Sequence, residues 1–145
     1  MSRDMSDRLL VVDDDDAIRQ TFRSFFSAAG FEVDLASNLT EAADRLAAVK
    51  YSAVIVDICL TERGTEGLAI AAYVRQIGRD LTVVILTAYG SPQRAAAAAR
   101  LDVDAFLHKP VSMVWLEGFL RSRITARRGE VPAGDLAGPV AVPAS

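Results

Sequence analysis

The stretch LLVVDDDD, residues 9–16, places four acidic side chains directly after four aliphatic ones. An aliphatic run of this kind is typical of a strand that is buried on both faces of a parallel sheet. The acidic residues that follow allow two interpretations, a solvated loop or a cation site. Which of the two holds depends on the residues that the fold brings to the same end of the sheet.

Five short apolar runs predict five strands, and the segments between them have helical spacing. The runs are RLLVVD (8–13), FEVDLA (31–36), SAVIVD (52–57), TVVILT (82–87) and DAFLHK (104–109). Between the first two, Ile18, Phe22, Phe25 and Ala29 repeat at helical spacing, and Gly30 ends the predicted helix. Because strand and helix alternate, the expected fold is α/β, a doubly wound parallel sheet with helices on both faces.

Capping residues mark the starts of further helices. Asn38 with Glu41 resembles a capping box, and Ser91 before a proline is a second helix start. The last helix is expected from about Ser112. After residue 127 the composition changes to a segment rich in proline and glycine, without periodicity. We therefore expect a domain over residues 1–127 and a flexible tail or truncated linker over residues 128–145.

The composition is that of a globular cytoplasmic protein without a membrane span. Of the 145 residues, 51% are hydrophobic and the formal charge is −3, which argues against a disordered chain and a general nucleic-acid binder. The opening residues MSRDMSD lack the basic and apolar regions of a signal peptide, and the apolar stretches are far shorter than the roughly 20 residues that span a bilayer. One cysteine, Cys59, and one histidine, His108, give neither an internal disulfide nor a zinc site.

Polar side chains stand at the predicted ends of four strands. Asp13 and Asp14 follow the first strand, Asp57 ends the third, Thr87 ends the fourth, and Lys109 ends the fifth. Open parallel sheets bind ligands beyond the carboxyl ends of their strands, where the strand order reverses. We therefore expect these side chains to share one crevice.

Electrostatics favours the cation site over the solvated loop. Two carboxylates about 4 Å apart repel by roughly 4 kcal/mol at an effective dielectric constant of about 20. Three carboxylates in one crevice therefore hold protons or a cation, and Mg²⁺ suits carboxylate, water and phosphate oxygens. Lys109 can then neutralise a phosphoryl oxygen, and the Thr87 hydroxyl can donate a hydrogen bond to another. A carboxylate in this setting is a phosphoryl acceptor.

The motifs LLVVDDDD, SAVIVD, ILTA and DAFLHKP, in this order and at these separations, resemble the receiver domain of bacterial two-component response regulators. The resemblance covers about residues 8–127. It implies a flavodoxin-like (βα)5 fold with strand order 2-1-3-4-5. It also implies a signalling protein, not an enzyme, that accepts a phosphoryl group from a sensor histidine kinase in a Mg²⁺-dependent reaction.

The resemblance implies a role for each matched position in the acceptor site. Asp57 is the phosphorylated residue. Asp13, Asp14 and Asp57 are the carboxylates that hold Mg²⁺, and the backbone carbonyl of Cys59 completes the metal shell. Lys109 binds the phosphoryl group.

The resemblance also implies a switch. Thr87 is the switch hydroxyl and Phe106 the switch aromatic, and the peptide between Lys109 and Pro110 is expected to be cis. Phosphorylation draws the Thr87 hydroxyl toward the phosphoryl oxygens and lets Phe106 turn inward. The face made by helix 4, strand 5 and helix 5 then changes shape, and a homodimer through this face is expected.

Two features depart from the family pattern. The loop after Asp57, ICLTERGTEG, is longer than the usual form, so its geometry near the metal is expected to differ. Asp102 stands where the family often has a glycine after helix 4, and aspartate adopts the left-handed conformation less readily than glycine.

Two other functions remain open on the residues alone. A haloacid-dehalogenase-like phosphatase would use Asp13 as its nucleophile, with Asp15 in a D-x-D motif, but such an enzyme needs a later acidic pair that the sequence lacks. A degenerate receiver would act only as an interaction module, although its acidic, threonine and lysine positions are here retained.

Overall fold

The computed structural model describes residues 7–57, 65–77, 80–87, 93, 96 and 99–127. Five parallel strands form one sheet in the order β2-β1-β3-β4-β5, as expected from the resemblance. The strands are β1 (Arg8–Val12), β2 (Glu32–Ala36), β3 (Ala53–Asp57), β4 (Thr82–Thr87) and β5 (Ala105–His108). The order reverses between β1 and β3, which places the topological switch point there.

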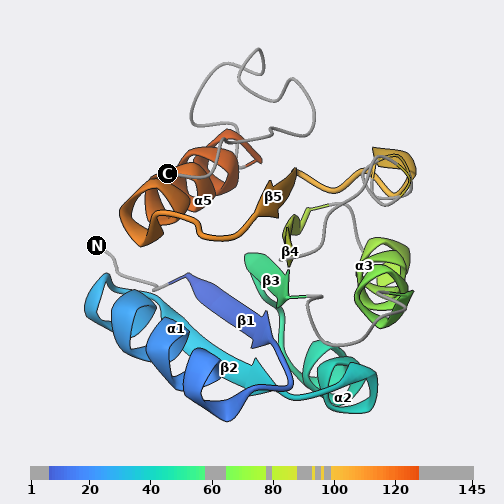
Figure 1. Cartoon of the computed structure of the whole chain (residues 1–145), viewed down its shortest axis with the longest axis horizontal. Helices are drawn as coiled ribbons and strands as arrows, with labels where there is room; N and C mark the ends of the chain where they lie inside the picture. Colours follow the sequence, from blue (N-terminus) through green and yellow to red (C-terminus); the bar gives the residue numbers. More distant parts are fainter. Residues whose placement is uncertain are drawn as a thin grey trace.

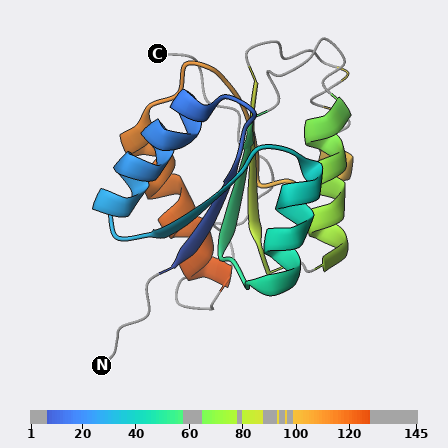
Figure 2. The same ribbon diagram turned by 90° about the horizontal axis from the view of Figure 1, so that it is seen from below.

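Helices cover both faces of this sheet. They are α1 (Asp16–Ala28), α2 (Leu39–Ala48), α3 (Thr65–Ile77) and α5 (Met113–Arg127). Figures 1 and 2 show α1 and α5 on one face and α2 and α3 on the other. The predicted helix start at Ser91 lies outside the described residues, although residues 93, 96, 99 and 100 are helical. None of the helices in the described part of the chain is long and apolar enough to cross a membrane.

Alternation along each strand divides the apolar side chains between two cores. Leu9 and Val11 of β1 pack beneath α1 and α5, whereas Leu10 and Val12 belong to the cluster beneath α2 and α3. The inner strands β3 and β4 divide their residues in the same way. Both faces are therefore buried, which is why these strands are almost continuous runs of Val, Ile and Leu.

Side chains cap the starts of three helices. The Asp15 carboxylate accepts a hydrogen bond from the Ile18 amide at the start of α1, and the Ser112 hydroxyl accepts one from the Trp115 amide at the start of α5.

At α2 the predicted capping box is only half formed. The Asn38 side chain accepts from the Glu41 amide at 2.9 Å, as expected. The Glu41 carboxylate, however, accepts from the amide and hydroxyl of Ser37, one residue before the cap. The hydroxyl of Ser37 is the reason for the difference, because it offers the carboxylate a second donor beside the amide.

The end of α1 is a Schellman motif held by α5. Gly30 has φ +105° and donates to the Ser27 carbonyl, and the Phe31 amide donates to the Phe26 carbonyl. Arg121 of α5 donates from Nη2 to the Ala29 carbonyl, and its guanidinium lies over the Phe31 ring, 4.5 Å from the centroid. A side chain remote in sequence therefore satisfies a helix-end carbonyl that would otherwise lack a partner.

A buried ion network lies at the opposite end of the sheet from the predicted crevice. Asp104 is 4% exposed; its carboxylate contacts Arg75 of α3 at 2.9 Å and Arg127 of α5 at 2.5 Å. The Val83 amide donates to the same carboxylate. Arg75 also donates to the carbonyl of Asp102, which has φ +60° and so adopts the left-handed conformation expected at that position. The network joins α3, β4, β5 and α5 at a single carboxylate.

Gly30→Ala and Gly118→Ala provide a matched test of the α1 end. An alanine at residue 30 must adopt a positive φ, so we expect the free energy of unfolding to fall by about 1–2 kcal/mol. The added Cβ would lie 3.5 Å from Arg121, an ordinary contact, so the cost is in the backbone. Gly118 is in a helix with nothing within 4 Å of its Cβ position, and its replacement should raise stability by about 0.5–1 kcal/mol. Urea denaturation measures the free energy of unfolding of both variants. Equal effects of the two substitutions would contradict the Schellman motif at Gly30.

Asp104→Asn tests the buried network. The substitution leaves two guanidinium groups without their buried counter-charge, and we expect a loss of about 3 kcal/mol in the free energy of unfolding. Glu32→Gln is the control, because Glu32 pairs with Arg8 at an exposed position and should cost less than about 1 kcal/mol. Thermal and urea denaturation give both values. A loss for Asp104→Asn no larger than that for the control would show that the network adds little.

Candidate functional site

The register of the sheet brings the predicted site residues to one end. Val12 of β1 pairs with Val56 of β3. Asp13 comes directly after Val12 and Asp57 directly after Val56, so the two aspartates lie side by side at the switch point between these strands. Asp57 pairs with Leu86, the neighbour of Thr87. Thr87 pairs with His108, and the Lys109 amide donates to the Thr87 carbonyl at 2.9 Å. Asp13, Asp57, Thr87 and Lys109 therefore occupy the carboxyl ends of four adjacent strands, as predicted.

Asp57 is held in an ion pair at this end of the sheet. Its side chain is 2% exposed, and Oδ2 contacts the Lys109 ammonium, whose side chain is 24% exposed. Burial makes an unpaired carboxylate costly, and the ammonium offsets that cost. The peptide between Lys109 and Pro110 is cis, as expected.

Asp13 is a second buried carboxylate beside Asp57. Its Oδ1 accepts a hydrogen bond from the Asp15 amide at 2.9 Å, whereas Oδ2 is buried and has no hydrogen-bond partner in the described part of the chain. Burial raises the pKa of Asp13 from its ordinary 3.8 to about 7. The hydrogen bond from Asp15 opposes this increase, and the neighbouring charge of Asp57 adds to it. The charged form of Asp13 is therefore disfavoured in this setting, and a bound cation would stabilise it.

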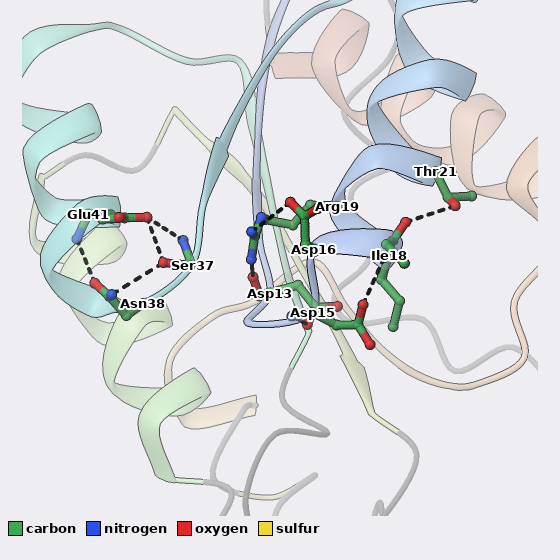
Figure 3. A network of polar contacts seen from close by, with 10 residues as sticks. Asp13, Asp15, Asp16, Ile18, Arg19, Thr21, Ser37, Asn38 and Glu41 are labelled. Atoms are coloured by element: carbon green, nitrogen blue, oxygen red, sulfur yellow. Dashed lines mark hydrogen bonds and ion pairs between the residues drawn. The ribbon is translucent and has the colours of Figure 1, made fainter.

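The loop after β1 is held by contacts on both sides of Asp13, and Figure 3 shows those that Arg19 makes. The Asp13 amide donates to the Ala36 carbonyl of β2 at 3.0 Å. The Asp13 carbonyl accepts from Nη1 of Arg19 at 2.6 Å, and Nη2 of the same guanidinium contacts Asp16 at 3.0 Å. Asp13 thus enters the site on a fixed backbone.

The structure tests the two other predicted metal ligands, Asp14 and Cys59, only in part. The side chain of Asp14 is exposed, and Cys59 and the loop after Asp57 lie outside the described residues. Within the described ranges, no group of three His, Cys, Asp or Glu side chains is arranged to hold a metal ion. The structure therefore brings together two of the three predicted carboxylates. The residues fit a cation because an unsatisfied buried oxygen of Asp13 lies beside Asp57.

The two predicted switch residues are buried. Thr87 is fully buried at the end of β4. Phe106 is opposite Ile85 in the register and packs in the cluster beneath α2 and α3. The phenylalanine has no hydroxyl that would need a partner in this apolar setting.

Comparisons with known proteins agree with this geometry. Residues 9–120 match the family model of the response regulator receiver domain. The chain belongs to this family. Response regulator MprA of Mycobacterium bovis is 32% identical over 133 residues, which cover 92% of this chain and 57% of that protein. The MprA protein of Mycobacterium ulcerans is 33% identical over 138 residues, with 95% and 58% covered. The receiver thus spans little more than half the length of these relatives.

Solved receiver structures share the fold. A CheY-like receiver domain protein from Methanospirillum hungatei superposes with a TM-score of 0.80 at 22% identity, covering 88% of this chain and 100% of that one. A response regulator from Burkholderia pseudomallei, solved with a phosphorylated aspartic acid, calcium ion and citrate, has a TM-score of 0.73 at 26% identity, covering 86% and 72%. These structures agree in fold with the family match, which shows that the chain is a receiver of two-component signal transduction.

Two residues of the receiver site did not emerge from the sequence pattern. The Asp15 side chain caps α1, whereas the sequence pattern placed it in the D-x-D motif of the phosphatase alternative. Arg19 holds the Asp13 carbonyl, and no sequence motif indicated this contact. The carbonyl contact depends on the turn between β1 and α1, which residue spacing alone does not specify.

Asp13→Asn tests the burial of this carboxylate. Because the native pKa of about 7 exceeds the ordinary 3.8, the native state binds more protons between about pH 4 and 7, and the free energy of unfolding falls as pH rises. The destabilisation caused by burying the charged Asp13 carboxylate is fully present above pH 7. We expect the variant to gain roughly 1–3 kcal/mol at pH 8 in EDTA and to lose this pH dependence.

Urea denaturation at pH 5 and pH 8 measures both effects. Asp44→Asn, at an exposed position on α2, is the control and should leave the pH dependence unchanged. An Asp13→Asn variant less stable than wild type at pH 8 would show that native contacts stabilise the charged carboxylate.

Proposed function

We propose that Asp57 accepts a phosphoryl group from a sensor histidine kinase in a Mg²⁺-dependent reaction. The single observation that carries the proposal is the buried Asp57 carboxylate, paired with Lys109 and adjacent to Asp13 at the switch point of the sheet. A carboxylate oxygen of Asp57 forms the new bond to phosphorus while the bond from phosphorus to the kinase histidine breaks. The imidazole leaves with the electron pair and takes up a proton.

The chain's own residues would prepare this transfer. Lys109 neutralises charge on the phosphoryl oxygens, and the Thr87 hydroxyl donates to one of them once the group is in place. Asp13, Asp14, Asp57 and the Cys59 carbonyl would hold the metal ion. When bound, Mg²⁺ supplies charge neutralisation between the carboxylates and the incoming phosphoryl group.

We further propose that phosphorylation switches the surface made by the helix after β4, by β5 and by α5. Movement of Thr87 toward the phosphoryl group would free space for Phe106, which lies two residues before the exposed end of β5. On α5, Val114 is 71% exposed, and the half-buried rings of Trp115 and Phe119 stack 5.1 Å apart. These side chains support a homodimer through this surface.

The unit that carries this function is proposed to be residues 1–127 in the cytoplasm, with residues 128–145 as a tail or linker. The arginines near the end of α5 make contacts within the chain, which argues against a nucleic-acid surface there. Arg121 caps α1 and Arg127 pairs with Asp104. The phosphatase alternative is disfavoured because Asp15, the second residue of its motif, is occupied as a helix cap.

Phosphorylation from a small donor tests the proposal. The protein is incubated with Mg²⁺ and acetyl phosphate, and intact mass is recorded for wild type, Asp57→Asn, Asp13→Asn and the control Asp44→Asn. We expect one base-labile phosphoryl group on wild type and Asp44→Asn, none on Asp57→Asn, and at least about a tenfold slower reaction for Asp13→Asn. EDTA should abolish the adduct. A phosphoryl group retained in Asp57→Asn, turnover of phosphomonoesters, or no adduct on wild type would refute the proposal.

A further inference from the structure

We infer that Arg19 is a positioning residue for the cation site. Its guanidinium fixes the peptide that joins Asp13 to Asp14, and so sets where the two carboxylates of that loop are presented. The inference rests on the proposed function, because it concerns how the proposed Mg²⁺ ligands are held.

Arg19 makes one contact to the backbone of the loop and one to a side chain. Nη1 donates to the Asp13 carbonyl at 2.6 Å, and Nη2 contacts Oδ1 of Asp16 at 3.0 Å. The Arg19 side chain is only 16% exposed, whereas that of Asp16 is 75% exposed. Figure 3 shows the guanidinium between Asp13 and Asp16. The less exposed contact, to the peptide oxygen, is therefore the one that restrains the loop.

Other hydrogen bonds fix the same loop at neighbouring points. The Asp13 amide is held by Ala36, Oδ1 of Asp13 is held by the Asp15 amide, and the Asp15 carboxylate is held by Ile18. The Asp13 carbonyl lies between these points, and Arg19 supplies a donor to it. Arg19 therefore adds restraint at the peptide from which Asp14 projects.

A positive charge beside a cation site would by itself weaken cation binding, because like charges repel. A positioning contact has the opposite effect, because ligands held in place lose less conformational freedom when a metal binds. The two roles of Arg19 therefore predict opposite effects on Mg²⁺ affinity when the guanidinium is removed. If repulsion dominates, removing the guanidinium strengthens Mg²⁺ binding. If positioning dominates, removing it weakens Mg²⁺ binding.

Mg²⁺ titration by calorimetry at pH 8 and low salt shows whether binding becomes weaker or stronger. We expect Arg19→Met to raise the Kd for Mg²⁺ about tenfold, the lower end of the effect typical of residues that orient metal ligands. Arg19→Lys keeps the charge but not the paired donors, so its Kd should fall between those of wild type and Arg19→Met. Arg23→Met removes the same charge from an exposed position one turn along α1 and should leave the Kd unchanged or slightly lower.

Amide hydrogen exchange without metal gives a readout that does not depend on Mg²⁺. We expect faster amide exchange over residues 13–16 in Arg19→Met, whereas the exchange of the amides in the sheet should be unchanged. Asp16→Asn should change exchange and Kd little, because it leaves the contact to the Asp13 carbonyl in place. Arg19→Lys serves both measurements if Arg19→Met does not fold.

The outcomes separate the inference from the proposed function. Mg²⁺ binding as tight in the Arg19 variants as in wild type, or tighter, overturns the inference and leaves the proposed function standing. A wild-type protein that binds no Mg²⁺ overturns both. Weaker binding in Arg19→Met with unchanged binding in Arg23→Met supports the positioning role.

Discussion

The burial of two carboxylates at one end of the sheet is the constraint on which the site depends. Asp13 and Asp57 follow adjacent parallel strands, so the sheet brings their negative charges together where little water reaches them. Lys109 offsets the charge of Asp57, whereas burial, together with the neighbouring charge of Asp57, raises the pKa of Asp13. The fold thus holds a buried negative charge that a cation would stabilise.

The buried carboxylates at the two ends of the sheet differ in how fully they are satisfied by partners within the described residues. At the amino end, Asp104 has two guanidinium groups and a backbone amide, which satisfy its carboxylate from within the chain. At the carboxyl end, Oδ2 of Asp13 has no hydrogen-bond partner in the described residues. The first arrangement is closed and joins elements of the fold. The second is incomplete by itself and is therefore the end suited to a ligand.

The sequence was sufficient to predict the sheet and four of the site positions. Buried parallel strands are short, apolar and bounded by polar residues, so strand ends such as Asp57 and Thr87 follow directly from the pattern. The contacts of guanidinium groups could not be predicted in the same way. Arg121 reaches α1 and Arg127 reaches Asp104 through tertiary distances that helical spacing does not encode. The exposure of Asp14 likewise depends on the turn after β1.

The bond from Arg121 to the Ala29 carbonyl has a consequence for how the chain acquires its structure. The two residues are 92 positions apart, so an emerging polypeptide completes α1 long before the helix that caps it exists. Until α5 arrives, that carbonyl depends on water, and the Phe31 ring lacks the cation that later lies over it. The end of the first helix is therefore completed only when the last helix has packed against it.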